Sequence, residues 1–353
     1  MTEGRQWEVQ EPVLTQSSEP TSKFSSAGYW ASYIVIVICV LLVNVFTQAD
    51  RFADFDNYIL YLNGLVHFPL PNWIYFETLS NLFFLGMYGI TQSVFSAMVL
   101  AHYGLGIIFV LAILVAFPPR QSSWPALLFT FAMLGPLLAF VTVRATPAYF
   151  LVAIGVRFAL NRRPVAWLCL LVATFFHIST LLALVPMALL YFERNLPMLL
   201  RSGRSRRYYL LVTLTIVAFS AVLSRLSSSL TSVIQSIPVI AKYDIYTDSV
   251  VNKTQIAHYI FLVFVLAMTI GFMTVRNNVS NRLNMYVLVS FALYVVMFFS
   301  ASPVAAFRQA PFWMMPMIAS LPWDKLGVNQ STAAVFVLAC AGLFFFQFGL
   351  VYI

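Results

Sequence analysis

Charged residues are scarce in this 353-residue chain: Asp, Glu, Lys and Arg together make up 9% of it, whereas hydrophobic residues make up 61%. A soluble domain carries roughly 25% charged residues. Several apolar runs here also reach the roughly 18 residues that a membrane helix needs. The composition therefore excludes a soluble globular domain. It predicts an all-α polytopic membrane protein with about 10 to 12 membrane helices.

Cysteine and the common catalytic motifs are lacking as well. Cys39, Cys169 and Cys340 lie far apart within apolar runs, which excludes a disulfide framework and the spacing of zinc ligands. Neither a Gly-rich phosphate loop nor a G-x-S-x-G motif occurs. The sequence therefore predicts no cofactor and no metal site. The net charge of +8 is attributed to cytoplasmic loops rather than to nucleic-acid binding.

The chain divides into a polar tail and one long apolar domain. Residues 1–28 are expected to form a flexible cytoplasmic tail. Residues 29–353 are expected to form a single transmembrane domain with outer loops at residues 48–77 and 225–256. The amphipathic segment Glu77–Gln92 is expected to lie at the membrane interface. The other expected spans are Tyr29–Thr47, Ser93–Phe117, Trp124–Val143, Thr146–Leu160, Tyr208–Ser224, Ala257–Val275, Asn284–Ala301, Phe307–Leu321 and Thr332–Tyr352.

Residues 165–192 form an apolar run that is too long for one straight membrane helix. At 1.5 Å per residue such a helix would reach about 42 Å, against a hydrocarbon core of about 30 Å. Basic residues flank both ends of the run, and like flanks favour two ends on the same side of the membrane. We therefore expect a helical hairpin that bends between His177 and Thr180. A single tilted helix is the alternative.

Basic residues also set the expected orientation, because cytoplasmic loops carry an excess of Lys and Arg. With the N-terminus inside, and with residues 165–192 returning to the cytoplasm, most of the 20 Lys and Arg residues lie on the cytoplasmic side. The exceptions are Arg51, Arg144, Arg225, Lys242, Lys253 and Arg308. Since these outer charges oppose the insertion preference, they are candidates for a functional site.

The outer face is expected to gather a polar pocket. Arg144 and Arg308 stand in tight turns, and guanidinium groups hold phosphate oxygens bidentately. His177 would face the same side at the hairpin apex, where nearby arginines favour a neutral imidazole that can act as a general base. Aromatic side chains can stack on sugar rings. The candidate substrate-binding residues are Arg51, Asp54, Asp56, Tyr58, Tyr61, Tyr243 and Tyr246.

Each of these residues also has a simpler interpretation. Arg144 and Arg308 could be interface anchors that reach lipid phosphates, and His177 could be an interhelical hydrogen-bonding residue. Asp54 and Asp56 resemble a D-x-D metal site, but a solvated or salt-bridged loop is favoured over it. The remaining histidines are expected at the interface or in loops: His67, His102 and His258.

The order of several short motifs carries a resemblance. The chain contains DFDNYILYLNG at residues 54–64, then Arg144, a helix that ends in Asn161-Arg162-Arg163, VATFFHIST at residues 172–180 and AAFRQAPFW at residues 305–313. Over about residues 45–320, this order resembles the EpsG/Wzy-type polysaccharide polymerases of bacterial inner membranes. Two positions differ from the usual family pattern, with Ala53 in place of Gly and Ala145 in place of Gln.

The resemblance implies a GT-C-like membrane glycosyltransferase that needs neither a metal ion nor a cofactor. Such an enzyme joins undecaprenyl-pyrophosphate-linked oligosaccharide repeat units on the periplasmic face of the inner membrane. An acceptor hydroxyl would attack the anomeric carbon with His177 as base, while Arg144 and Arg308 stabilise the leaving pyrophosphate. The implied partners are these lipid-linked glycans, membrane lipid and, as a further candidate, a chain-length regulator protein.

Two other functions remain open. A flippase or exporter of lipid-linked oligosaccharides would need basic residues along a path between helices, whereas here they concentrate on one face. An O-antigen ligase would share the scaffold and the leaving group, but ligases carry a larger outer loop than residues 225–255. The sequence therefore favours the polymerase.

Overall fold

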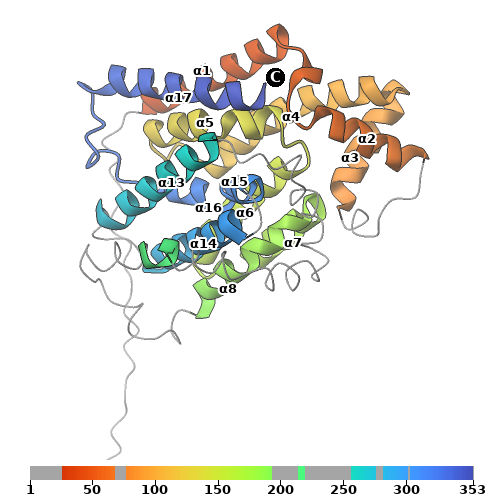
Figure 1. The fold of residues 1–353 in the computed structure, drawn as a ribbon. Helices are drawn as coiled ribbons and strands as arrows, with labels where there is room; N and C mark the ends of the chain where they lie inside the picture. Colours follow the sequence, from red (N-terminus) through yellow and green to blue (C-terminus); the bar gives the residue numbers. More distant parts are fainter. Residues whose placement is uncertain are drawn as a thin grey trace, which may run out of the picture.

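The computed structural model describes residues 26–67, 77–192, 214–218, 256–275, 281–300 and 303–352. Within these ranges every regular element is a helix, and extended pairing is limited to one isolated bridge between Phe52 and Tyr352 (Figure 1). The first half of the fold comprises α1 (Ser26–Phe46), η1 (Ala49–Arg51), α2 (Phe55–His67), α3 (Thr78–Thr91), α4 (Val94–Ala116), α5 (Trp124–Phe140) and α6 (Ala145–Leu160). The second half comprises α7 (Val165–Phe176), η3 (Ile178–Ala183), α8 (Leu184–Phe192), α13 (Ile256–Val275), α14 (Asn281–Ser300), α15 (Pro303–Gln309), α16 (Pro311–Ala319) and α17 (Ala333–Val351).

Four helices in the described part of the chain are long and apolar enough to cross a membrane: α1, α4, α14 and α17. Several shorter apolar helices accompany them, among them α5, α6, α7 and α13. Large apolar side chains cover the outside of α1 and α17; Phe46 is 79% exposed and Leu338 is 72% exposed. In water such a surface would be unstable, whereas in lipid it needs no cover. The chain is thus an all-α polytopic membrane protein, as its composition predicts.

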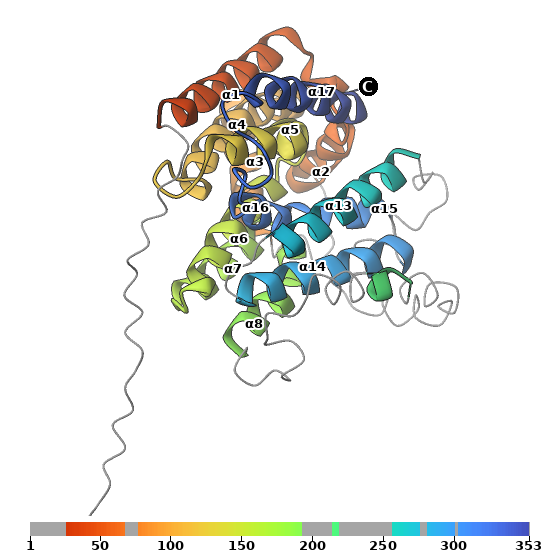
Figure 2. The ribbon, with the colours of Figure 1, turned by 90° about the vertical axis from the view of Figure 1, so that its left-hand side faces the viewer.

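Helices α5 and α6 lie at the centre of the molecule. α1 and α17 cover one face of α5, whereas α7, α8 and α14 lie on the opposite side of the fold (Figures 1 and 2). Nearly every side chain of α5 is buried, including those of both of its prolines, Pro125 and Pro136. A helix that is apolar all round belongs in such an interior position.

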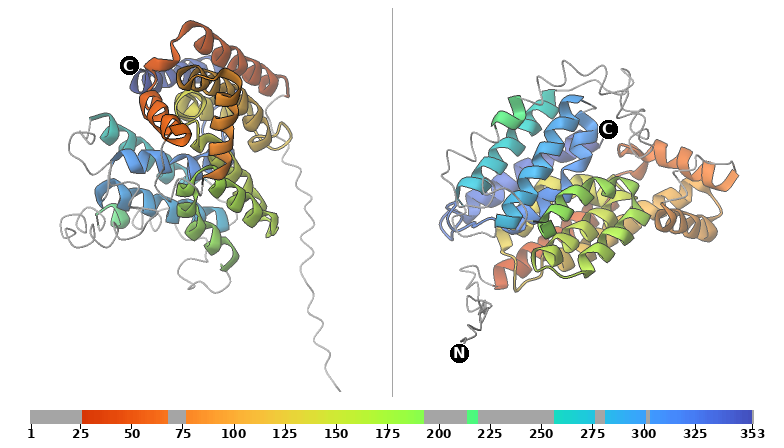
Figure 3. Two further views of the ribbon diagram at one scale, coloured as in Figure 1. Left: turned by 90° about the vertical axis from the view of Figure 1, so that its right-hand side faces the viewer. Right: turned by 90° about the horizontal axis from the view of Figure 1, so that it is seen from below.

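Most functional candidates gather at one end of this bundle. The segment between η1 and α2 meets the end of α17 there, because the Ala53 amide donates to the carbonyl of Val351 at 2.8 Å. Helices α2 and α3 lie beside the bundle at the same end (Figure 3). At the opposite end, the Arg282 guanidinium donates to the carbonyl of Leu160 at 3.1 Å. Which side of the membrane each end faces stays a prediction.

The predicted hairpin at residues 165–192 is confirmed. α7 ends at Phe176, His177 adopts an extended conformation, and η3 and α8 lead the chain back along α6. Gly155 of α6 lies close to both arms of the hairpin. A Cβ atom there would lie 3.2 Å from Cys169 Cβ in α7 and 3.4 Å from Met187 Cε in α8. The lack of a side chain at Gly155 lets both arms of the hairpin approach α6 closely.

Three sequence-based boundaries differ from the structure. The expected span Phe307–Leu321 is two short helices, α15 and α16, because Pro311 has no amide hydrogen to continue the first helix. The Ala310 amide instead donates to the carbonyls of both Ala306 and Phe307, each at 3.2 Å.

The other two differences concern the tail and the outer loops. α1 begins at Ser26, inside the expected tail, and the expected loop at residues 48–77 contains η1 and α2. The predicted span at residues 208–224, apart from residues 214–218, lies outside the described residues. So does nearly all of the loop at residues 225–256.

Candidate active site

Three residues that are distant in sequence form the central charged group. The carboxylate of Glu77, at the start of α3, is fully buried. Its Oε2 accepts a hydrogen bond from Arg144 Nη1 at 2.9 Å, and its Oε1 lies 3.0 Å from His177 Nδ1. A buried charge needs a partner of opposite sign or several hydrogen bonds. Arg144 and His177 are therefore held together by one carboxylate that separates their side chains.

The turn before α6 places Arg144. The Thr142 carbonyl accepts the amides of Ala145 and Thr146, and the two threonine hydroxyls contact each other at 2.9 Å. This network fixes Arg144 at the first position before the helix, where its side chain is 15% exposed. Burial alone would lower the pKa of the guanidinium, but the Glu77 carboxylate raises it above its ordinary value. Arg144 is accordingly a permanent cation.

The bend after α7 places His177. The amide of His177 closes α7 by donating to the Ala173 carbonyl at 2.9 Å, and Thr180 Oγ1 donates back to the His177 carbonyl at 2.9 Å. Ser179 Oγ lies 3.0 Å from His177 Nε2. Thr180 therefore satisfies a backbone group of the bend, whereas Ser179 contacts the imidazole.

Two tyrosines of α2 form an aromatic wall beside Arg144. Its guanidinium carbon lies 4.2 Å from the ring centre of Tyr61 and 5.4 Å from that of Tyr58, within the range of cation–π attraction. The Tyr61 hydroxyl donates to Asn81 Oδ1. Burial raises the pKa of Tyr61 to about 12, although the neighbouring Arg144 guanidinium opposes the shift. The hydroxyl thus stays protonated.

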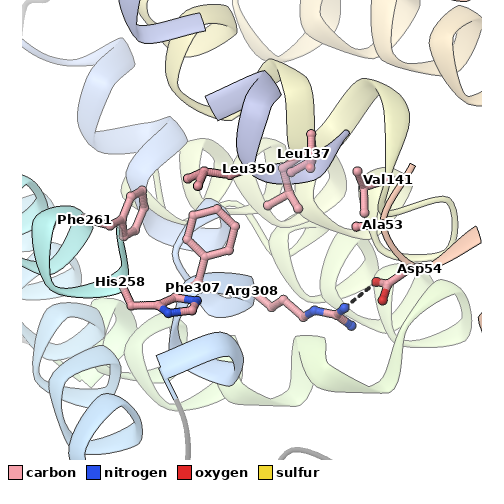
Figure 4. Close-up of a pocket in the computed structure, with 10 residues that line it drawn as sticks. Ala53, Asp54, Leu137, Val141, His258, Phe261, Phe307, Arg308 and Leu350 are labelled. Atoms are coloured by element: carbon pink, nitrogen blue, oxygen red, sulfur yellow. Dashed lines mark hydrogen bonds and ion pairs between the residues drawn. The ribbon is translucent and has the colours of Figure 1, made fainter. Parts of the chain in front are cut away.

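Arg308 belongs to a second charged group. Its guanidinium pairs with the carboxylate of Asp54 (Figure 4), and its backbone carbonyl accepts the Tyr149 hydroxyl at 2.5 Å. Asp54 also accepts Asn57 Nδ2 at 3.2 Å and has a positive φ of 70°. Few residues other than glycine adopt this conformation, and aspartate is among those that tolerate it. The conformation directs the carboxylate across the bundle to α15.

A cavity of about 150 Å³ opens beside this second ion pair. It lies between α5, α13, α15 and α17, and Figure 4 shows Arg308 and Asp54 at one side and His258 at another. The rest of its wall is mainly apolar. The lining residues also include Ala53, Leu137, Val141, Phe261, Phe307, Leu350 and Val351.

Helix α2 connects the two charged groups. Asp54 directly precedes this helix, and Tyr58 and Tyr61 are three residues apart, a spacing that puts the two tyrosines on one helical face. The Tyr58 amide donates to the Asp54 carbonyl at 3.0 Å, so the helix is regular from its first turn. Arg308 therefore pairs with the residue before α2, and Arg144 lies beside two tyrosines in its first turns.

Comparison with known proteins gives one match. The sequence model of the EpsG family matches residues 29–353, which is nearly the whole chain. The chain belongs to the EpsG family. No curated protein and no solved structure matches it. Membership in this family indicates a polysaccharide-polymerase type of function, that of a membrane glycosyltransferase.

The structure of this EpsG-family protein brings some of the predicted site residues together. Arg144 and His177 meet through Glu77, while Arg308 lies in the adjoining group with Asp54. The neighbour of His177 is thus a carboxylate, whereas guanidinium groups were expected around it. Tyr58 and Tyr61 line the first group.

Other candidates do not join the site. Arg51 is exposed and its Nε donates to Gln48 Oε1 at 3.0 Å, and Asp56 is also exposed. Tyr243 and Tyr246 lie outside the described residues. The described residues contain no group of three His, Cys, Asp or Glu side chains that could hold a metal ion.

Three residues were missed or misplaced by reasoning from the sequence: Glu77, His102 and His258. Glu77 was not singled out, although an acidic residue at the start of an apolar helix in a membrane protein is a signal. His102 was expected at an interface or in a loop, but it is only 3% exposed in α4 and stacks on the Phe52 ring at 4.7 Å. His258 lines the cavity beside Arg308. Nothing in its local sequence indicated this position.

Proposed function

We propose that this protein is a polysaccharide polymerase that joins polyprenyl-pyrophosphate-linked oligosaccharide repeat units, with undecaprenyl as the lipid. The observation that carries the proposal is the place of Arg308. Its guanidinium lies at the border of an apolar cavity and pairs with Asp54, the residue before α2, and the first turns of this helix carry the tyrosines that contact Arg144. A substrate with an apolar chain, a pyrophosphate and a glycan requires this succession of apolar wall, cation and aromatic surface.

Arg308 is the primary pyrophosphate ligand in this proposal. Its side chain is 26% exposed and it already pairs with one anion, the Asp54 carboxylate, which supports a position for phosphate oxygens there. A planar guanidinium can hold two such oxygens at once. The isoprenoid end would then lie against Phe261 and Phe307 in the cavity. Arg144, which lies beside Tyr58 and Tyr61 of α2, would stabilise the charge that develops on the leaving group.

His177 is the proposed general base, and Tyr58 and Tyr61 are the proposed sugar platform. The acceptor hydroxyl forms a bond from its oxygen to the anomeric carbon of the donor and gives its proton to the imidazole. The bond from that carbon to the phosphate oxygen breaks, and its electron pair leaves with the pyrophosphate. The products are a glycan longer by one unit and polyprenyl pyrophosphate. The proposed reaction needs no metal ion, since the arginines compensate the negative charge on the leaving pyrophosphate.

We further propose that this site faces the periplasm of a bacterial inner membrane. The other end of the bundle, with Arg157, Arg163 and Arg282, would then face the cytoplasm. This agrees with the excess of basic residues in cytoplasmic loops. A chain-length regulator protein is a proposed partner. Arg51 and Asp56 are exposed at the end of the bundle that holds the proposed site. Tyr243 and Tyr246 are retained as proposed substrate-binding residues.

Polysaccharide gels from a deletion strain test the polymerase against its alternatives. A polymerase mutant makes single capped units without polymer, and complementation restores the ladder. An O-antigen ligase mutant instead accumulates polymer that is not attached to the lipid A core. A flippase mutant retains lipid-linked units on the cytoplasmic side. Either of the last two results would overturn the proposal, and synthesis of a ladder by the purified protein from lipid-linked units would support it directly.

A further inference from the structure

In the described structure, Glu77 links the proposed base, His177, to one of the proposed cations, Arg144. Its side chain is fully buried, at the border between α3, α6 and α7. Removing one partner from a buried ion pair is strongly destabilising, because the other charge is left uncompensated. A carboxylate in such a position therefore has a strong effect on the groups around it.

One oxygen of Glu77 fixes the bend at His177. Oε1 accepts the Ile178 amide at 3.2 Å and lies 3.0 Å from His177 Nδ1. An ionised carboxylate can only accept hydrogen bonds, so the proton of a neutral imidazole must be on Nδ1. The other ring nitrogen, Nε2, then carries the lone pair, and Ser179 Oγ donates to it at 3.0 Å.

The other oxygen of Glu77 fixes Arg144. Oε2 accepts Arg144 Nη1 at 2.9 Å, while the guanidinium lies over Tyr61. Because both oxygens belong to one rigid planar group, the basic nitrogen of His177 and the guanidinium of Arg144 keep a fixed relative position. Glu77 and His177 are far apart in the sequence, with residue numbers that differ by 100.

We propose that Glu77 is a positioning residue that holds His177 in the tautomer with its proton on Nδ1 and keeps Nε2 as the base. The proposal rests on the proposed function. In the free protein Ser179 Oγ occupies the position of the acceptor sugar hydroxyl. When substrate binds, the sugar hydroxyl replaces Ser179 Oγ and donates to His177 Nε2. When the hydroxyl proton moves to Nε2, the imidazolium is stabilised by the Glu77 carboxylate, which remains ionised between two cations. Orienting carboxylates of this kind act on the rate of the chemical step rather than on binding.

Imidazole NMR tests the positioning without any reaction. The chain has four histidines, so ¹⁵N-imidazole-labelled protein in nanodiscs gives few signals, and His177→Gln assigns the relevant one. We expect the proton on Nδ1 in the wild type and a mixture or the Nε2 form in Glu77→Gln. A matched control is Ser80→Ala, since Ser80 Oγ donates to the Phe176 carbonyl at 2.7 Å on the same pair of helices. The control should keep the wild-type tautomer.

The double variant Glu77→Gln/Arg144→Gln covers the case in which the single variant does not fold. It removes both members of the buried pair, so that no uncompensated charge remains, and it should show the same loss of the Nδ1 tautomer. A proton that stays on Nδ1 in either Gln variant would overturn the positioning role.

Kinetics with lipid-linked repeat units provide the second measurement. We expect kcat of Glu77→Gln to fall at least about 100-fold, with KM within about 3-fold of wild type, and Glu77→Asp to recover part of kcat. Ser80→Ala should stay near wild type. An unchanged kcat in Glu77→Gln, or a loss that resides in KM, would contradict the inference. A fully active His177→Gln would instead contradict the proposed base, and the tautomer measurement would still decide the role of Glu77.

Discussion

The guanidinium of Arg308 pairs with the carboxylate of Asp54, although 254 residues separate the two in sequence. The pair joins α15, near the end of the chain, to the start of α2, near its beginning. Both residues line the apolar cavity. A substrate anion that binds Arg308 must compete with this carboxylate, so Asp54 sets how strongly the arginine holds its ligand.

Substitution of the arginines by lysine should abolish polymerisation. Arg308→Lys and Arg144→Lys keep the positive charge but lose the planar fork that holds two oxygens, so neither should restore a ladder in the deletion strain. Loss of one such electrostatic contact typically costs about 100- to 1,000-fold in rate. Arg157→Lys is the matched control, because Arg157 lines a small cavity at the other end of the bundle. Wild-type ladders from both Lys variants at the site would reduce these arginines to membrane anchors.

Removing the competing carboxylate should have the opposite effect on donor binding. Asp54→Asn keeps the size of the side chain but withdraws the negative charge from Arg308, so the lipid-linked donor should bind more tightly. We expect a lower KM for the donor, measured with the purified protein. Asp56→Asn is the control, since Asp56 follows closely in sequence but is exposed. A raised KM in Asp54→Asn would show that the carboxylate binds the substrate or orients the arginine.

Replacement of His177 should stop the reaction while the protein is still produced and still binds its donor. General-base catalysis is typically worth about 100- to 10,000-fold in rate, so His177→Ala should give no visible ladder. His177→Gln can form a hydrogen bond but cannot take up a proton, and it should fail as well. An active Gln variant would mean that only a hydrogen bond is needed and that the base lies elsewhere, with Asp54 as the first alternative.

The close contact at Gly155 predicts a clear effect on stability. In Gly155→Val the new side chain would meet Cys169 Cβ and the Ala166 carbonyl within 3.3 Å of its first carbon. Overpacking of this kind costs about 1 to 3 kcal/mol, measurable as a lower free energy of unfolding in SDS titration. Gly271→Val is the control, because a Cβ atom there would meet nothing within 4 Å. Equal stability of the two variants would show that the hairpin is looser than the structure indicates.

Cysteine labelling should place the two ends of the bundle on opposite sides of the membrane. Asp56 and Gln121 are both exposed, and the three native cysteines can be replaced by alanine. A membrane-impermeant maleimide should label Asp56→Cys in intact spheroplasts and Gln121→Cys only after permeabilisation. The reverse pattern would invert the orientation and with it the proposed periplasmic site.

The sequence by itself determined the class of the protein and most of its helices. Scarce charge and long apolar runs permit only a helical membrane protein, because backbone groups in lipid must be satisfied within each helix. The hairpin at residues 165–192 was also predictable, since its length and its basic flanks are local properties. Both kinds of information are contained in single continuous segments of the chain.

The tertiary structure alone decided which charges meet. Arg144, Arg308 and His177 stood out because charge near apolar helices is costly, but their partners Glu77 and Asp54 could not be assigned from the sequence. An ion pair depends on how helices pack and on which side of each helix faces its neighbour. The sequence pattern predicted arginines around His177, whereas the packing of α3 against α7 puts the Glu77 carboxylate beside it. Contacts across 100 or more residues depend on that packing, which local patterns do not specify.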